Sequence, residues 1–173
     1  MSSVLTPRGL LLGLAALLAP ALAHAAPVAP DRNATATVDI VPPSSVRKLE
    51  DLDFALLSVT TAGTAVINPN TDAMTTTGGV LHAGGVPHAA HFEAISPVRA
   101  VVIIRIPRDP VTITRVGGTE TMTVSNWTMT GNARRTVAAH EAFTFKVGGT
   151  LNVNANQVEG TYVGTFDVQV QYP

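Results

Sequence analysis

The sequence predicts an all-β fold in which antiparallel strands form a two-layered sandwich, and three observations lead to this prediction. The composition is poor in charged (13%) and aromatic (5%) residues and rich in Thr, Val, Ala and Gly, which suits strands joined by turns. Short alternating or apolar runs follow one another, with Gly, Pro and Asn between them. After the first residues, no sustained apolar period of 3.6 residues is present, so we expect no helices between the strands.

Candidate strands follow one another at short intervals, and roughly ten are expected. In chain order they cover residues 34–41, 53–59, 63–68, 75–83, 89–95, 100–106, 111–116, 121–129, 143–147, 150–155 and 160–172. Because no helix separates them, they indicate an antiparallel, immunoglobulin-like sandwich rather than βαβ units. We therefore expect residues 34–173 to form a single domain, preceded by a flexible segment over residues 26–33.

Four stretches carry more specific expectations. Residues 100–106 are the most β-branched and predict a central strand. Residues 45–54 predict a turn of helix or an irregular entry into a strand, and residues 131–140 predict a polar loop. Gly148 and Gly149 together predict a hairpin turn between two strands.

The first residues are expected to be removed from the protein. Arg8 precedes the apolar run GLLLGLAALLAPALA, and the small residues of AHAA follow. The run is shorter than the roughly 20 apolar residues that a membrane helix needs, and a small-residue cleavage site comes directly after it. This pattern predicts a bacterial signal peptide over residues 1–25, cleaved after Ala25 or alternatively after Ala23. It also predicts an exported protein in the periplasm, on the cell surface or outside the cell.

The rest of the chain argues against several classes of function. It contains no cysteine, which excludes thiol catalysis and thiolate metal sites. Loss of Arg8 takes the formal net charge from −1 to −2, and the basic residues are scattered along the chain. This argues against nucleic acid or an anionic membrane as a partner. We expect no membrane span once the signal peptide is cleaved.

Three histidines are the candidates for a metal site. His82, His88 and His91 lie within ten residues and near Glu93, and imidazole binds zinc and copper. On one strand, His91 and Glu93 would share a face while His88 would lie on the opposite face. The spacing matches no established zinc pattern, so we expect polar residues around a glycine-rich turn and no cofactor. Metal binding is the alternative interpretation.

No catalytic chemistry is expected. A Gly-x-Ser-x-Gly motif is absent, and His140 and Glu141 are sequence neighbours, whose side chains point to opposite faces of a strand. The paired carboxylates of glycosidases meet only in space, so the sequence leaves that alternative open. The prediction is a protein that is not an enzyme.

Three stretches resemble one protein family. They are GGTETMTVSNWTM, FTFKVGGTLNV and GTYVGTFDVQVQYP. Over roughly Ala34 to Tyr172, the chain resembles the bacterial exported family known as domain of unknown function 4402. That family ends in a Val-Gly-Gly-Thr-Leu block followed by Gly-x-Tyr-x-Gly-x-Phe-x-Val-x-Val-x-Tyr. Where such proteins often carry Phe-Gly, this chain has Phe54-Ala55, which puts the local bulge or close approach usually served by the glycine in doubt. The resemblance implies no catalytic residues.

The C-terminal stretch alternates along its whole length. One face, expected to lie against the core, carries Gly160, Tyr162, Gly164, Phe166, Val168, Val170 and Tyr172. We expect one long strand here, with Gly164 allowing a bend between the sheets. More distantly, the chain is similar to subunits of pili built by the chaperone–usher route, which implies a pilin-like sandwich. Such subunits carry a glycine fourteen residues from the C-terminus and an aromatic next to last, the places of Gly160 and Tyr172 here.

This resemblance also implies a role for the N-terminal segment. Pilus subunits carry an N-terminal extension of alternating apolar residues that completes the sheet of a neighbouring subunit. In this chain Ala34, Ala36, Val38 and Ile40 alternate in the same way. A sheet edge offers unpaired backbone groups to such a strand, whichever chain supplies it.

Two interpretations of function stay open. The first is a structural or adhesive subunit of the cell surface, which assembles with itself or related subunits and is helped by a periplasmic chaperone. The second is a monomeric exported binding module in which residues 34–41 complete their own sandwich. The sequence pattern does not distinguish an intramolecular strand partner from an intermolecular one.

Overall fold

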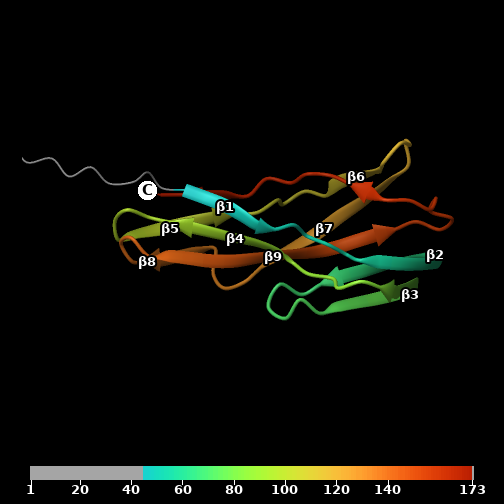
Figure 1. The fold of residues 1–173 in the computed structure, drawn as a ribbon, viewed down its shortest axis with the longest axis horizontal. Helices are drawn as coiled ribbons and strands as arrows, with labels where there is room; N and C mark the ends of the chain where they lie inside the picture. The colour runs from blue at the N-terminus through green and yellow to red at the C-terminus, as the bar shows by residue number, and fades with distance from the viewer. Residues whose placement is uncertain (1–44, 173) are drawn as a thin grey trace, which may run out of the picture. The chain divides into compact units, whose positions relative to one another are not determined.

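The structure is a computed structural model of the chain, and it describes residues 45–172. Eleven antiparallel β-strands and no helix make up this part (Figure 1). The predicted all-β antiparallel sandwich is therefore confirmed. Three predictions lie outside the described residues: the signal peptide (1–25), the segment 26–33, and the candidate complementing strand with Ala34, Ala36, Val38 and Ile40.

The strands form two sheets of unequal size. Six strands of the larger sheet lie side by side in the order β1 (Ser45–Glu50), β4 (Ala90–Ile95), β9 (Ala142–Val153), β7 (Thr121–Met129), β6 (Val111–Arg115) and β10 (Tyr162–Val163). Two further strands belong to this sheet but lie outside that order. β2 (Leu56–Ile67) pairs with β9 and with β3 (Met74–Gly84). The smaller sheet has the order β11 (Gln169–Gln171), β5 (Ala100–Arg105) and β8 (Arg134–Val137). Residues 100–105 are thus the middle strand of the smaller sheet.

The core consists of two clusters of buried side chains. One joins the larger sheet to β5 of the smaller one and consists of Ala90, Phe92, Ile104, Phe145 and Val147. Its centre is a stacked pair of rings, Phe92 and Phe145, whose centroids lie 5.4 Å apart. The other cluster lies where β2 and β3 meet the rest of the larger sheet and consists of Ala65, Val80, Met122, Val124, Leu151 and Val153. Alternate residues of each strand supply these side chains, as the period of two requires.

Gly148 and Gly149 lie inside a continuous strand, so the predicted hairpin turn at this position is wrong. β9 runs through them without interruption. Along one edge, β9 pairs first with β4, up to Val147, and then with β2, from Thr150 onward. At the change of partner, a Cβ on Gly148 would lie 2.3 Å from the carbonyl oxygen of Ile67. The glycines therefore serve close backbone packing within the sheet and not a turn.

Two further local predictions are wrong for a common reason. Residues 45–50, expected to be a helical turn or an irregular entry, form the edge strand β1, which pairs with β4. Within the predicted loop 131–140, residues 134–137 form β8, which pairs with β5. Both segments lack clear alternation of apolar residues. Their strand conformation comes from main-chain pairing with a neighbouring strand, which overrides local propensity.

β2 and β3 form a hairpin that doubles back on itself midway along its length (Figure 1). The register of the pair is broken between Val59 and Gly63 on β2. Opposite this break, Gly78 has a positive φ of 64°, and a Cβ on it would lie 2.3 Å from the carbonyl oxygen of Ala62. A side chain at this position would clash with the backbone of β2, so glycine permits the sharp fold. As a result, the first half of β2, residues 56–59, is separated from its second half.

Candidate functional site

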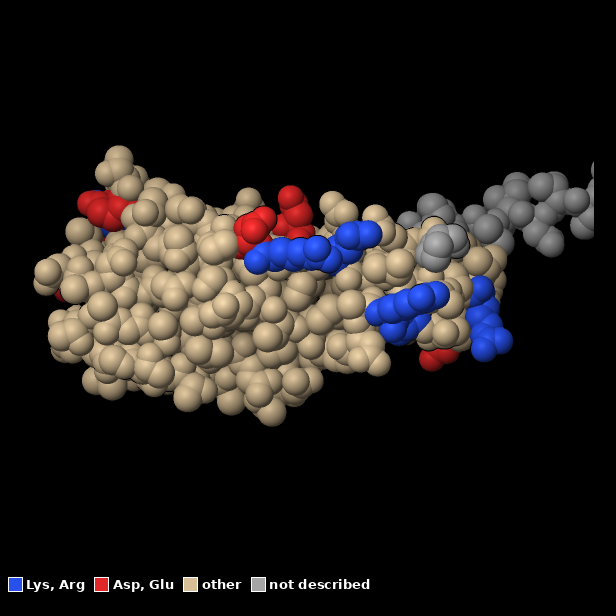
Figure 2. Space-filling view, turned by 180° about the vertical axis from the view of Figure 1, so that it is seen from behind, with Lys and Arg blue, Asp and Glu red and all other residues tan. Residues whose placement is uncertain are grey.

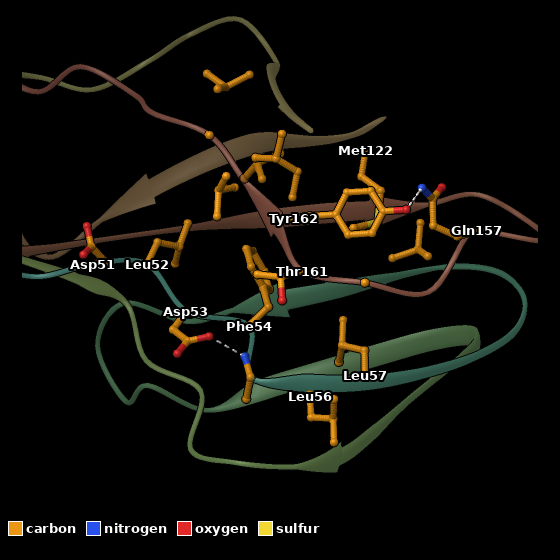
Figure 3. Close-up of a pocket in the computed structure, with 18 of the residues that line it drawn as sticks. Asp51, Leu52, Asp53, Phe54, Leu56, Leu57, Met122, Gln157, Thr161 and Tyr162 are labelled. Atoms are coloured by element: carbon orange, nitrogen blue, oxygen red, sulfur yellow. Dashed lines mark hydrogen bonds between the residues drawn. The ribbon is translucent and has the colours of Figure 1, made fainter. Parts of the chain in front are cut away.

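An open groove of about 1180 Å³ lies in the described part of the chain. One wall is the segment from Glu50 to Val59, which includes the first half of β2. The other wall is the C-terminal chain from Gln157 to Phe166 (Figure 3). The floor is mostly apolar and comes from the middle of the larger sheet: Val111, Ile113, Met122, Val124, Trp127 and Val153. The groove is thus larger than the roughly 300–1,000 Å³ of a usual small-molecule pocket.

Leu56 and Leu57 of the β2 wall both line the groove, and their side chains point in opposite directions (Figure 3). Leu57 is directed toward the C-terminal chain, whereas Leu56 points the opposite way (Figure 3). Leu57 packs against the core cluster that includes Met122, while Leu56 is 62% exposed. The sequence analysis did not assign this wall to a site. The sequence signal that could have done so is the pair Gly78-Gly79, which permits the hairpin to double back.

Both walls present backbone that lacks a strand partner on the side of the groove. Among the described residues, Leu57–Val59 pair only with β3, and Tyr162–Val163 pair only with β6. Within residues 45–172, the segment 164–168 belongs to no strand and pairs with no neighbouring strand. Unpaired N–H and C=O groups along an extended chain form the template to which another strand binds.

The C-terminal stretch is not one long strand, so that part of the prediction is wrong. It forms two short strands, β10 in the larger sheet and β11 in the smaller one, and the chain crosses between the sheets over residues 164–168. At the start of the crossing, a Cβ on Gly164 would lie 2.7 Å from Cγ2 of Ile113 and 2.8 Å from the carbonyl oxygen of Thr112. Gly164 therefore lets the chain lie directly on β6 as it leaves the larger sheet.

The alternate side chains of this stretch nevertheless face inward. Tyr162, Phe166, Val168, Val170 and Tyr172 are half-buried, whereas Gly160 and Gly164 are exposed. The ring of Phe166 lies 4.7 Å from that of Trp127, centroid to centroid, and 6.4 Å from that of Phe92. Phe166 therefore fixes the crossing segment on the core, although the backbone around it pairs with no strand of residues 45–172.

Two tyrosines anchor the ends of the C-terminal chain. The Tyr162 hydroxyl donates a hydrogen bond to the carbonyl oxygen of Val158 (2.6 Å) and accepts one from Nε2 of Gln157 (2.7 Å). The Tyr172 hydroxyl donates to the carbonyl oxygen of Ile95 (3.1 Å), and burial raises the pKa of Tyr172. Both hydroxyl groups therefore tie the C-terminal chain to the rest of the fold.

Gly160 lies at the entrance to the groove and has a positive φ of 145°. A Cβ there would lie 2.9 Å from Cδ of Arg115. The Arg115 guanidinium donates two hydrogen bonds to the Glu120 carboxylate (2.7 and 3.2 Å), and this pairing lowers the pKa of Glu120 to about 2. Gly160 therefore leaves space for an ion pair that closes the β6–β7 hairpin.

Ala55 adopts the conformation that glycine favours, with φ of 56°. Its N–H donates a hydrogen bond to Oδ1 of Asp53 (2.7 Å), which holds the turn into β2. The backbone bend expected of the usual glycine is therefore kept in this chain, although a side chain in the left-handed region costs roughly 1–2 kcal/mol. Asp53 and Ala55 together set the position of the groove wall that follows.

The three histidines do not come together. His82 on β3 is exposed, and its Nε2 lies 3.0 Å from the carbonyl oxygen of Gly84. Nδ1 of His91 lies 3.9 Å from Oε2 of Glu50. The backbone of His88 bridges to Asp53, and its buried Nδ1 has no hydrogen-bond partner among the described residues. Within residues 45–172, no three His, Cys, Asp or Glu side chains are placed to hold a metal ion.

Charged side chains are few on the doubled hairpin, whereas four acidic residues line the groove: Glu50, Asp51, Asp53 and Glu159. From Phe54 to Pro87, Asp72 is the one residue that is Asp, Glu, Lys or Arg. Figure 2 shows a broad area free of such side chains on the face turned away from the viewer of Figure 1. In the part of the chain that the structure describes, no helix is long and apolar enough to cross a membrane. The groove itself combines an apolar floor with acidic residues on its walls.

Comparisons with known proteins place the chain in one family. No curated protein and no solved structure matches the chain. The model of one family, described as a domain of unknown function (DUF4402), matches residues 45–172. The match spans both sheets and both walls of the groove, and on this evidence the chain belongs to the DUF4402 family.

Proposed function

We propose that this protein is an exported, non-catalytic structural subunit of the bacterial cell surface, which assembles by accepting a β-strand from another chain. The observation that supports the proposal is the groove between residues 56–59 and 161–166, whose backbone has no strand partner on the side of the groove among the described residues. An added strand would supply main-chain partners to both walls and place alternate side chains on the apolar floor.

The energetics favour a strand over a small molecule as the occupant. The floor and walls present rows of apolar side chains, and full burial of one Val or Ile of the incoming strand contributes about 1.5–3 kcal/mol. Each main-chain hydrogen bond adds roughly 1 kcal/mol net. A strand that fills several positions therefore forms a persistent contact, which suits a structural assembly.

The remaining features of the proposal come from the sequence. A signal peptide over residues 1–25 accounts for export, and a periplasmic chaperone would cover the groove until assembly. The non-catalytic role rests on the sequence, which has no Gly-x-Ser-x-Gly motif and no cysteine. The competing function, a monomeric binding module that completes its own fold, makes the opposite prediction about oligomeric state.

A charge placed in the groove should abolish assembly. We expect Leu57→Arg to leave the exported protein monomeric, because an arginine on the groove wall would bury an unpaired charge under an incoming strand. Size-exclusion chromatography with light scattering, and electron microscopy of the cell surface, would measure this on the full-length protein.

Leu81→Arg is the matched control. Leu81 lies on β3 opposite Ser58 and does not line the groove, and its side chain is 59% exposed, so this change should leave assembly as in the original protein. Circular dichroism would establish that both variants are folded. The proposal fails if the unchanged protein is a stable monomer, or if both variants assemble equally well.

A further inference from the structure

We infer that the outer face of the smaller sheet binds an acidic polysaccharide, whose carboxylate groups are held by Arg105 and Arg134. None of the strand residues on this face lines the groove, so the ligand site goes beyond the proposed assembly and does not depend on it. The inference is based on the position of the two arginines, on their lack of acidic partners and on the polar residues around them.

The side chains of the smaller sheet alternate between the core and solvent. Val102 and Ile104 of β5 are buried, which directs Arg105 to the opposite, outer face. On the neighbouring strand β8, Arg134 pairs with Ile103 and is exposed. Arg134 and Arg105 are therefore diagonal neighbours on one face of the sheet, roughly 7–8 Å apart.

Polar residues that carry no charge surround the two arginines. Gln169 of β11 pairs with Arg105 and Gln171 pairs with Ile103, and both glutamines are exposed, as is Thr136 of β8. Nε of Arg105 donates a hydrogen bond to Oε1 of Gln171 (3.0 Å), which holds the guanidinium on the face. Amide and hydroxyl groups both donate and accept hydrogen bonds. The face can therefore bond to sugar hydroxyl groups as well as to carboxylates.

The arginines of this face differ from the cations of the larger sheet in their partners. Every Lys or Arg in a strand of the larger sheet belongs to an ion pair: Arg47 with Glu93, Lys48 with Asp51, Arg115 with Glu120 and Lys146 with Asp72. No carboxylate of residues 45–172 pairs in this way with Arg105 or Arg134. Because two like charges this close repel each other, their placement does not serve the fold alone and indicates an anionic partner.

The basic residues are scattered along the sequence but gather in the fold. Figure 2 shows most of the Lys and Arg side chains in the half of the molecule that contains β5 and β8. Arg99, directly before β5, is exposed and adds positive charge beside this sheet. Arg135 has a different role, because its guanidinium donates hydrogen bonds to the carbonyl oxygens of Thr130 (2.8 Å) and Asn132 (3.0 Å). The ligand site is therefore assigned to the outward-facing arginines.

The composition of the face favours a polysaccharide over nucleic acid or a membrane. Unpaired bases bind by stacking on aromatic rings, and β5, β8 and β11 contain no Phe, Tyr or Trp. An anionic membrane attracts dense clusters of Lys and Arg, whereas this face alternates arginine with glutamine and threonine. A guanidinium binds a carboxylate through two parallel hydrogen bonds. An acidic polysaccharide offers such carboxylates together with hydroxyl groups along an extended chain.

Binding of short polygalacturonate oligomers to the full-length exported protein tests the inference. Isothermal titration would compare this protein with its Arg105→Gln and Arg134→Gln variants. We expect each change to lower the affinity about tenfold, the usual effect of losing one charge-assisted hydrogen bond. Arg47→Gln is the matched control, because it removes the same charge from an exposed arginine of the larger sheet. It should change the affinity by no more than about twofold.

Asp167 provides a change in the opposite direction. It is exposed and lies two residues before Gln169, so the alternation of exposed and half-buried residues places it on the same outer face. Its carboxylate would repel the ligand, and we expect Asp167→Asn to raise the affinity several-fold. An unchanged or lower affinity would count against the position of the ligand on this face.

Three results would overturn the inference. One is the absence of polygalacturonate binding. Another is an equal loss of affinity in Arg134→Gln and Arg47→Gln, because binding would then depend on net charge alone. The third is tighter binding of polyglutamate, duplex DNA or phosphatidylglycerol vesicles than of polygalacturonate, because the ligand would then belong to another class.

The Leu57→Arg variant separates this site from the groove. It should bind polygalacturonate with unchanged affinity, because Leu57 lies on the groove wall. Loss of binding in this variant would place the ligand in the groove and overturn the inference. Retained binding in a protein that never assembles would leave the inference standing while the proposed function failed.

Discussion

Phe145→Ala is expected to lower the free energy of unfolding by about 3–5 kcal/mol, which is a large part of the stability of a domain of this size. Phe145 is 1% exposed and lies in the middle of β9. Its ring stacks on Phe92, with centroids 5.4 Å apart, and both belong to the cluster that joins the two sheets. Removal of the ring would open a cavity at this junction, which the surrounding strands cannot close without breaking their ladders.

Urea denaturation followed by tryptophan fluorescence would measure the effect, since Trp127 packs against the same cluster. Phe143→Ala is the control, because Phe143 is on the same strand but half-buried, with its ring beside the Arg135 guanidinium. Loss of the Phe143 ring should lower the free energy of unfolding by clearly less than loss of the Phe145 ring does. If the two variants lost the same free energy of unfolding, the sheets would not be joined through Phe145.

Gly148→Ala is expected to destabilise the protein by about 3 kcal/mol, although it adds only one methyl group. The added Cβ would lie 2.3 Å from the carbonyl oxygen of Ile67 and 3.0 Å from Cδ of Pro69. The nearest atom is main chain and belongs to the end of β2, so it cannot move aside by a change of rotamer. The substitution would push β2 away from β9 at the point where β9 changes partner.

Gly149→Ala provides the comparison for this prediction. Its Cβ would meet Cγ1 of Val124 at 3.1 Å and Cε3 of Trp127 at 3.3 Å. Because these are side-chain atoms, small shifts can relieve the contact, and we expect a loss of about 1 kcal/mol. Thermal unfolding of the two variants side by side measures the difference. If the Gly148→Ala protein were as stable to heat as the Gly149→Ala protein, the proposed clash with the Ile67 backbone would be wrong.

The fold class could be predicted from the sequence because it depends on local features. Alternating residues such as Met122 and Val124, and the turn residues between the runs, indicate strands wherever they occur. The absence of helical periodicity then leaves the antiparallel sandwich. The structure confirms this class, and the family match over residues 45–172 confirms the resemblance carried by the two C-terminal motifs.

What the sequence could not predict depends on pairing between distant segments. Gly148 and Gly149 look like a turn, and only the approach of Ile67 shows that they serve a packed strand. The C-terminal stretch alternates throughout, yet whether it remains in one sheet depends on which edges are free. The groove itself exists because the hairpin doubles back at Gly78, which no local pattern of apolar residues reveals.

The groove itself was not predicted from the sequence. Of the alternating C-terminal residues, which were expected to face the core, Gly160, Tyr162, Gly164 and Phe166 line the groove, and the wall from Glu50 to Val59 was not anticipated. The strand with Ala34, Ala36, Val38 and Ile40 stays a prediction, because it precedes the described residues. The histidines, which were weighed as metal ligands, lie on separate elements and are not grouped at a site.

Hydrogen–deuterium exchange at the crossing segment tests the central claim most directly. The amides of residues 164–168 pair with no strand in the described chain, so they should exchange fast in the monomeric Leu57→Arg variant. In the assembled protein, an added strand should pair with this segment and slow their exchange by orders of magnitude. Equally fast exchange in the assembled protein and in the monomer would contradict the account, because the groove would then contain no strand.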